Sequence, residues 1–249
     1  FQAEDGIRDS STSRGLGDVY KRQSMSSITL FTSGSTDQPK DVTHSWDHIK
    51  KCATKSIKEI GLTEEDRVLD VFPANTIAHY TITGVPAFLS GAQYVSSNFS
   101  AYTYLDLFRR FKPTYIALIP RHLELLLGTK GFKDLDMSCV KYMVTGSSKI
   151  DQNFIDEFKN KGVQKVANWY GMTEVPPPIM IGYDSPAFDF NTINHQENHV
   201  MFMPLQATGT NLQHCIINGR STGDIFNMDT KEYHGRLKEA NGHTWKNNF

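Results

Sequence analysis

The chain has 249 residues, of which 39% are hydrophobic, so it can bury a core and form one large domain or two small ones. Its 26 Lys and Arg residues nearly balance its 27 Asp and Glu residues, giving a formal net charge of −1. Without a dense basic stretch, the composition gives no support to nucleic-acid binding. No apolar run approaches the roughly 20 residues that span a bilayer, and no signal peptide is evident, so we expect a soluble, cytoplasmic protein.

The first 24 residues form a segment that we exclude from the fold. They mix acidic, basic and glycine residues without a sustained helix or strand period. The string also resembles translated sequencing-adaptor read-through, with a native disordered tail as the alternative interpretation. We therefore begin the predicted fold at residue 25.

From residue 27 onward, short apolar runs alternate with amphipathic stretches, which is typical of βα units. We expect strands at residues 28–32, 67–72, 92–96, 114–119, 140–145 and 163–169. Helices are expected at residues 46–60, 101–111, 121–127 and 151–161, the last beginning at a capping aspartate. This pattern predicts an α/β fold with a mostly parallel sheet and flanking helices.

The regular pattern fades after three consecutive prolines at residues 176–178, and residues 179–226 favour short strands and loops of a smaller β-rich layer. We therefore predict four parts: a tail at 1–24, an α/β nucleotide-binding core at 25–178, a β-rich subdomain at 179–235, and a hinge with the C-terminus at 236–249.

A hydroxyl-dense segment, FTSGSTDQPK at residues 31–40, follows the first predicted strand. Gly34 lets backbone amides approach an anion closely, and Lys40 adds a positive charge. Hydroxyl donors come from Thr32, Ser33, Ser35 and Thr36. The segment lacks the Gly-Lys pair of a Walker A loop. It predicts a phosphate-binding loop, with a polar surface turn as the alternative.

A second segment, NWYGMTE at residues 168–174, ends another predicted strand. The carboxylate of Glu174 suits a hard cation such as Mg²⁺, and the ring of Tyr170 beside Gly171 can lie flat against a base. The alternative is a strand-to-loop turn with a solvated glutamate.

A third motif consists of two segments, STGD at 221–224 and YHGRLKE at 233–239. It contains Asp224, and an aspartate can accept hydrogen bonds from both hydroxyls of a ribose.

In this order, the three motifs resemble those of the adenylate-forming family (AMP-dependent synthetases and ligases, acyl-CoA synthetase-like), over the central portion of its large N-terminal domain. The family's phosphate loop is commonly written [YF]TSG[ST]TGxPKG. Residues 31–36, Pro39 and Lys40 match it, whereas Asp37 and Asp41 replace glycines and place negative charge beside the triphosphate site.

The resemblance implies roles for individual residues. Tyr170 would pack beside adenine, Thr173 would contact the α-phosphate, and Glu174 would help to hold Mg²⁺. Asp224 would bind the ribose and Arg236 the nucleotide, with Glu239 at a hinge.

Two further positions are implied near the acyl group. Gly146 and Ser147 stand where the family has a small-residue loop that walls the adenine and acyl pockets. His79, at the end of FPANTIAH, stands where an aromatic residue or histidine gates the carboxylate; the alternative is a structural histidine.

The resemblance implies an AMP-forming acid–thiol ligase that uses ATP and Mg²⁺ to convert a carboxylic acid to an acyl-adenylate. Coenzyme A or a carrier-protein thiol would then capture the acyl group. The family's C-terminal domain, which supplies a catalytic lysine, is not recognised after residue 239, and a separate protein resembling that domain would provide it. The alternative is a non-catalytic nucleotide- or acyl-binding module, favoured by Asp37 and Asp41. Nothing in the sequence identifies the acid.

Overall fold

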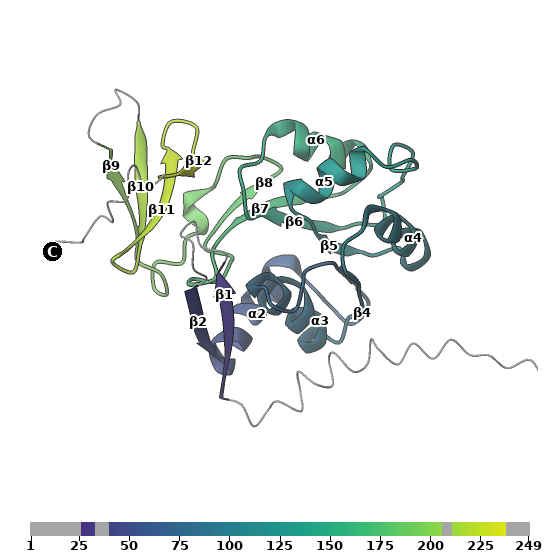
Figure 1. Ribbon diagram of the computed structural model, residues 1–249, viewed down its shortest axis with the longest axis horizontal. Helices are drawn as coiled ribbons and strands as arrows, with labels where there is room; N and C mark the ends of the chain where they lie inside the picture. The colour runs from purple at the N-terminus through teal and green to yellow at the C-terminus, as the bar shows by residue number, and fades with distance from the viewer. Residues whose placement is uncertain (1–25, 33–39, 206–210, 238–249) are drawn as a thin grey trace, which may run out of the picture.

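The computed structural model describes residues 26–32, 40–205 and 211–237, which form two β-sheets, a separate β-hairpin and the helices packed around them (Figure 1). The central sheet has six strands in the order β4-β3-β5-β6-β7-β8. Five of them are parallel: β3 (Arg67–Asp70), β4 (Gln93–Ser96), β5 (Tyr115–Ala117), β6 (Tyr142–Gly146) and β7 (Val166–Tyr170). The predicted mostly parallel α/β fold is confirmed.

Helices cover both faces of this sheet, because its central strands carry apolar side chains on both sides. One face packs against α4 (Ala101–Phe111), α5 (Pro120–Leu127) and α6 (Gln152–Asn160). The other packs against α2 (Trp46–Ile60), the π-helix η2 (His79–Thr83) and α3 (Gly84–Ser90). Figure 1 shows α5 and α6 above the sheet and α2 and α3 below it.

Local signals explain why α2 has the predicted bounds. Ser45 caps its first turn by accepting a hydrogen bond from the backbone of His48, and Gly61 ends it in the left-handed conformation. Helix α6 begins in the same way, since the Asp151 carboxylate accepts from the backbone of Phe154. Helices η2 and α3 were not predicted, because both are short, and the sequences HYTIT and GVPAFLS show no helical period.

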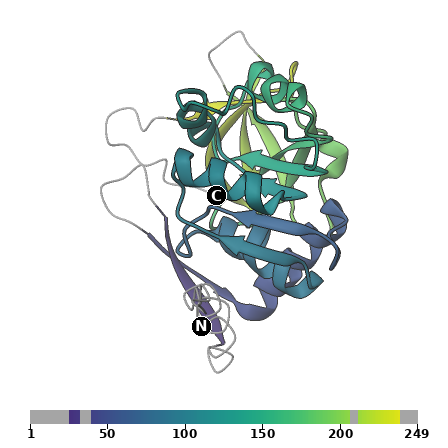
Figure 2. The same ribbon diagram turned by 90° about the vertical axis from the view of Figure 1, so that its right-hand side faces the viewer.

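The first predicted strand lies outside the six-stranded sheet, which corrects the expectation from the sequence. This strand, β1 (Ser27–Thr32), instead pairs antiparallel with β2 (Lys40–Ser45), and the pair stands apart from the sheet in both views (Figures 1 and 2). Strand β2 was not predicted, because its sequence, KDVTHS, has no apolar run. The hairpin packs on α2 through the buried side chains of Leu30 and Ile49.

The smaller sheet is antiparallel, with the order β12-β11-β10-β9. Its strands are β9 (Val200–Pro204), β10 (Leu212–Ile217), β11 (Arg220–Asn227) and β12 (Glu232–Arg236). Strand β8 (Met180–Tyr183), expected in this β-rich layer, instead extends the six-stranded sheet antiparallel to β7. Near the 3₁₀ helix η3 (Phe190–Thr192), Met180 of β8 packs in the core shared with the smaller sheet, whereas Ile181 packs on the face covered by α2 and α3. The short sequence of β8 does not encode this placement.

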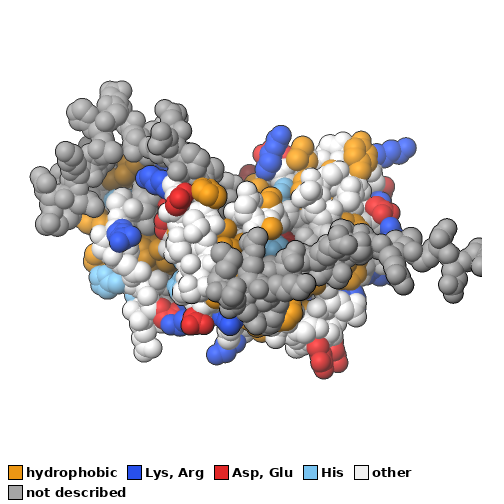
Figure 3. Space-filling model, turned by 60° about the horizontal axis from the view of Figure 1, so that its bottom comes forward, with side chains coloured by type: hydrophobic (Ala, Val, Ile, Leu, Met, Phe, Trp, Pro, Cys, Tyr) orange, Lys and Arg blue, Asp and Glu red, His pale blue; other side chains and the backbone are white. Residues whose placement is uncertain are grey.

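The surface agrees with the balanced composition. On the face shown in Figure 3, basic and acidic side chains of the described residues are interspersed rather than gathered by sign. Across the described ranges, no helix has the length and apolar character needed to cross a bilayer.

Candidate functional site

A cleft of about 500 Å³, a volume that includes its opening to solvent, lies where the carboxyl ends of β6 and β7 face β11 and β12. Ligands of open α/β sheets characteristically bind beyond the carboxyl ends of the parallel strands. Six of the predicted nucleotide-binding residues line this cleft: Gly146, Ser147, Tyr170, Gly171, Asp224 and Arg236. The fold therefore brings together segments that are up to 90 residues apart in the sequence.

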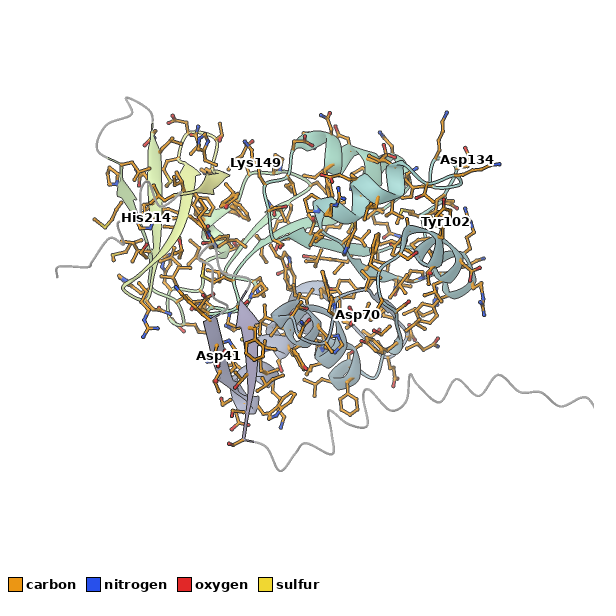
Figure 4. All side chains as sticks on the ribbon, viewed as in Figure 1. Asp41, Asp70, Tyr102, Asp134, Lys149 and His214 are labelled. Atoms are coloured by element: carbon orange, nitrogen blue, oxygen red, sulfur yellow. The ribbon has the colours of Figure 1, made fainter. Side chains whose placement is uncertain are left out.

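The loop after β6 forms one wall of the cleft and passes very close to β7. A side chain at Gly146 would place its Cβ 2.3 Å from the carbonyl oxygen of Trp169, so only glycine fits. The next residue, Ser147, has a φ of 71°, a left-handed conformation that costs a non-glycine residue on the order of 1 kcal/mol. Lys149, on the same loop, projects from the surface (Figure 4).

A buried carboxylate joins the two sheets at the opposite wall. Asp224, on β11, is only 3% exposed. Its Oδ2 accepts a hydrogen bond from the Tyr170 hydroxyl at 2.7 Å, and its Oδ1 accepts one from Nε of Arg236 at 2.8 Å. This hydrogen bond raises the pKa of Arg236, and burial followed by the Asp224 charge raises the pKa of Tyr170. Asp224 thus holds an ordered set of polar groups at the cleft.

The ring of Tyr170 is enclosed by two other aromatic rings. It meets Phe226 edge-on at 5.1 Å between centroids and Phe188 at 6.1 Å. Such edge-to-face contacts fix a ring in one orientation. Tyr170 therefore presents a fixed surface to the cleft. Phe188 also lines the cleft and was not predicted, because no motif in the sequence includes it.

The loop after β7 is held by two close contacts near its start. At Gly171 a Cβ would lie 2.6 Å from Pro177, so a side chain there would displace the loop. At Thr173, the carbonyl oxygen accepts a hydrogen bond of 2.6 Å from Nε2 of His44, on β2. The Thr173 side chain is half-buried and that of Glu174 is exposed. His44 was not predicted as a site residue, since nothing near it in the sequence reports a contact 129 residues away.

The predicted phosphate loop is described only at its two ends. Thr32 and Lys40 are register partners at the end of the hairpin where residues 33–39 connect its two strands, and Lys40 is exposed. Ser33, Gly34, Ser35, Thr36 and Asp37 lie outside the described residues, as does Glu239. Asp41 is exposed on β2 (Figure 4), where solvent screens its charge.

His79 lies at a different part of the same sheet edge. It begins η2, beyond the carboxyl end of β3, and does not line the cleft described above. Its Nδ1 is 2.7 Å from a carboxylate oxygen of Asp70. The structure therefore separates His79 from the nucleotide-binding residues while keeping it on the carboxyl side of the sheet.

A magnesium ion would fit the acidic residues here only together with phosphate oxygens. Among the described residues, no group of three or more His, Cys, Asp or Glu side chains could enclose a metal. Mg²⁺ is usually held by one or two carboxylates, water and the phosphates of its nucleotide. Glu174, the predicted magnesium ligand, is exposed but is not among the residues that line the cleft.

The sequence is similar to one described family and to several curated proteins. A family model described as AMP-binding enzyme matches residues 18–201, beginning inside the segment that we had excluded from the fold. An indoleacetate–CoA ligase of Aromatoleum aromaticum is 29% identical over 161 residues, which cover 64% of this chain and 31% of that protein. A crotonobetaine/carnitine–CoA ligase of Salmonella typhi is 28% identical over 149 residues, covering 58% and 28%. The chain thus spans about a third of the length of these relatives.

Solved structures share the fold at low sequence identity. An anthranilate CoA ligase in complex with anthranoyl-AMP matches with a TM-score of 0.67 and 17% identity, covering 84% of this chain and 46% of that one. An O-succinylbenzoate coenzyme A synthetase from Bacillus subtilis, in complex with ATP and magnesium, matches with a TM-score of 0.64 and 21% identity, covering 82% and 48%.

Proposed function

Because the chain belongs to the AMP-binding enzyme family, we propose that it binds MgATP in the cleft between β6, β7 and the smaller sheet, and adenylates a carboxylic acid there. The observation that carries this proposal is the convergence of Gly146, Tyr170, Asp224 and Arg236 on one cleft. The family resemblance implies that these residues line the nucleotide site.

The proposed binding mode uses the polar groups that Asp224 organises. The two ribose hydroxyls would donate to the Asp224 carboxylate, sharing it with Tyr170 and Arg236. The Arg236 guanidinium stays charged throughout and would face the phosphate end of the nucleotide. Glu174 would hold the magnesium ion that arrives with the phosphates and neutralises part of their charge.

The proposed reaction is an in-line displacement at the α-phosphorus. A carboxylate oxygen of the acid forms a bond to the α-phosphorus, while the bond between the α-phosphorus and the oxygen that bridges it to the β-phosphorus breaks. Pyrophosphate leaves, and an acyl-adenylate remains. Thr173 would orient the α-phosphate, and His79 would lie on the acyl side. The protein contributes mainly position and charge stabilisation.

The later step and the partners belong to the same proposal. Coenzyme A, or a carrier-protein thiol, would attack the acyl carbonyl and release AMP, giving a thioester. A separate protein resembling the family's C-terminal domain would supply the lysine that accelerates adenylation. We place the reaction in the cytoplasm, as expected from the sequence.

The alternative function is a non-catalytic nucleotide- or acyl-binding module. Its support came from the acidic residues that replace glycines in the phosphate loop. The exposure of Asp41 weakens that support, because repulsion between charges at about 4 Å is only about 1 kcal/mol in water.

The proposal is tested by ATP–pyrophosphate exchange against a panel of carboxylic acids, with MgATP affinity measured by calorimetry. We expect exchange with at least one acid, and a 10- to 100-fold loss of MgATP affinity in Asp224→Asn, because a charge-assisted hydrogen bond contributes about 1.5–3 kcal/mol. The matched control is Asp134→Asn, an exposed aspartate on the loop after α5 (Figure 4), which should bind like the parent protein. MgATP binding without exchange would favour the non-catalytic module, and absence of MgATP binding would overturn both.

A further inference from the structure

A completely buried carboxylate, Asp70, lies at the carboxyl end of β3, in the interior of the molecule (Figure 4). Its Oδ2 accepts hydrogen bonds from Nδ1 of His79 at 2.7 Å and from the Tyr94 hydroxyl at 2.6 Å. Its Oδ1 accepts a third from the backbone N–H of Phe72 at 2.9 Å. Burying a carboxylate costs free energy unless fixed donors compensate it, and here three donors do.

These contacts determine where the protons lie. The Phe72 N–H can only donate, and burial followed by the Asp70 charge raises the pKa of Tyr94, so its hydroxyl keeps its proton. With donors converging on both oxygens, the carboxylate accepts from each of its partners. The Nδ1 atom of His79 must therefore carry a proton, and Nε2 is the ring nitrogen that remains available.

The surroundings of His79 keep the ring in one position. The rings of His79 and Tyr80 are nearly perpendicular, with 5.0 Å between their centroids, and Gly84 leaves space where a Cβ would lie 3.1 Å from Nε2. Over the described residues, Nε2 has no hydrogen-bond partner in the protein, and the side chain is 14% exposed. One ring nitrogen is thus fixed in the interior, while the other has no hydrogen-bond partner among the described residues.

The backbone around His79 is also held by specific contacts. It begins a π-helix, a rare conformation that occurs frequently at functional sites. Two carbonyls of this helix accept side-chain hydrogen bonds: that of Thr81 from the Ser56 hydroxyl at 2.6 Å, and that of Ile82 from the Tyr115 hydroxyl at 2.9 Å. The backbone that carries the imidazole is therefore held in one conformation by these hydrogen bonds.

We propose that Asp70 is a positioning residue for the acid substrate: it holds Nδ1–H of His79, so that Nε2 alone is presented to the substrate carboxylate. This inference rests on the proposed adenylation and on His79 facing the acyl group. With Nδ1 occupied by its hydrogen bond to Asp70, a second proton on the ring would lie on Nε2, from which it can be donated to a carboxylate oxygen as a charge-assisted hydrogen bond. The site would accordingly select the ionised form of the acid.

The first test uses the unaltered chain and needs no activity. In ¹⁵N–¹H correlation spectra of the ¹⁵N-histidine-labelled protein, with the His79 signals identified by their loss in His79→Gln, we expect Nδ1 to carry a proton. A neutral ring protonated only on Nε2 would overturn the proposal. This measurement stands even if no acid supports pyrophosphate exchange, so failure of the proposed function and failure of this inference are distinguishable.

The second test is the variant Asp70→Asn. The amide oxygen would accept from the Phe72 N–H, so the NH₂ group would face His79 and force the proton from Nδ1 to Nε2. We expect this change of tautomer, together with an increase of about tenfold in KM for the acid and an unchanged KM for ATP. The matched control, Tyr94→Phe, removes another partner of the same oxygen and should retain the parent tautomer and KM.

A double-mutant cycle separates positioning from a structural role. If Asp70 acts through His79, Asp70→Asn should add less than about a twofold further effect on KM for the acid in the His79→Gln background. An equal loss in both backgrounds, or equal loss of ATP and acid affinity, would overturn the proposal. If Asp70→Asn fails to fold, the tautomer of His79 in the unaltered protein still tests whether Asp70 holds a proton on Nδ1.

Discussion

His122 shows how the surroundings of a single residue decide its charge. Its ring stacks on Phe99 with 3.9 Å between centroids and 12° between planes. Its Nδ1 accepts a hydrogen bond from the backbone N–H of Ile119 at 3.4 Å, at the start of α5. Burial lowers the pKa of His122 from 6.5 to about 4, so the folded protein contains the neutral ring at neutral pH.

We expect this histidine to make the free energy of unfolding fall as pH falls from about 6.5 to about 4. In that window the unfolded chain binds a proton that the folded protein excludes, so acid favours unfolding. The loss should be on the order of 2 kcal/mol, after allowance for the partial exposure of the ring. Urea unfolding at pH 7 and pH 4.5 measures it. His122→Asn should lose less stability between these pH values, whereas His195→Asn, an exposed histidine, should behave like the parent protein. Equal pH dependence in all three proteins would contradict the assignment.

At the level of elements, the β1–β2 hairpin and the loop after β7 act as one unit. They are joined by the His44 side chain, whose Nε2 donates to the Thr173 carbonyl. His44 is buried on one side by the adjacent ring of His48, at 5.3 Å. The hairpin carries Lys40 and the loop carries Glu174. This hydrogen bond therefore holds in position, relative to each other, two motifs that the proposed function requires together.

We expect His44→Ala to weaken MgATP binding by about tenfold, because Thr173 and Glu174 would lose their fixed position relative to the hairpin. His44→Gln should recover part of the affinity, because its amide can donate to the same carbonyl. The control is His48→Ala, which removes the neighbouring ring but not the hydrogen bond. Calorimetric titration with MgATP measures the effect, and a similar loss in His44→Ala and His48→Ala would show that ring packing, not the hydrogen bond, is responsible.

At the scale of the whole molecule, the two sheets meet along an aromatic core that includes a buried polar contact. Phe188 and Phe226 pack against Tyr170, and the Tyr170 hydroxyl reaches across to Asp224. A nucleotide bound in the cleft would contact both sheets, so its binding free energy would oppose their separation.

We expect saturating MgATP to raise the thermal midpoint of unfolding. At a concentration of about 100 times Kd, ligand binding adds about 2.7 kcal/mol, which corresponds to about 5–10 °C for a chain of this size. Scanning calorimetry with and without MgATP measures the shift. Asp224→Asn should reduce it, while Asp134→Asn should leave it unchanged. A full shift in Asp224→Asn would place the nucleotide elsewhere.

The sequence by itself determined the features that depend on neighbouring residues. The bounds of α2 and α4 agree with those predicted, since amphipathic period and end signals are local. The motif segments around Gly146, Tyr170 and Asp224 were also identified in advance, because chemistry that requires glycine, an aromatic ring or a carboxylate restricts the residue type.

Only the tertiary structure decided which distant residues meet. The pairing of β1 with β2 and the addition of β8 to the six-stranded sheet depend on packing partners that a local pattern does not contain. The same holds for the contact of His44 with Thr173 and for the burial of Asp70 under His79. A hydrogen bond between side chains far apart in the chain leaves no period or spacing in the sequence, so the partners that position the predicted site residues became visible only in the folded molecule.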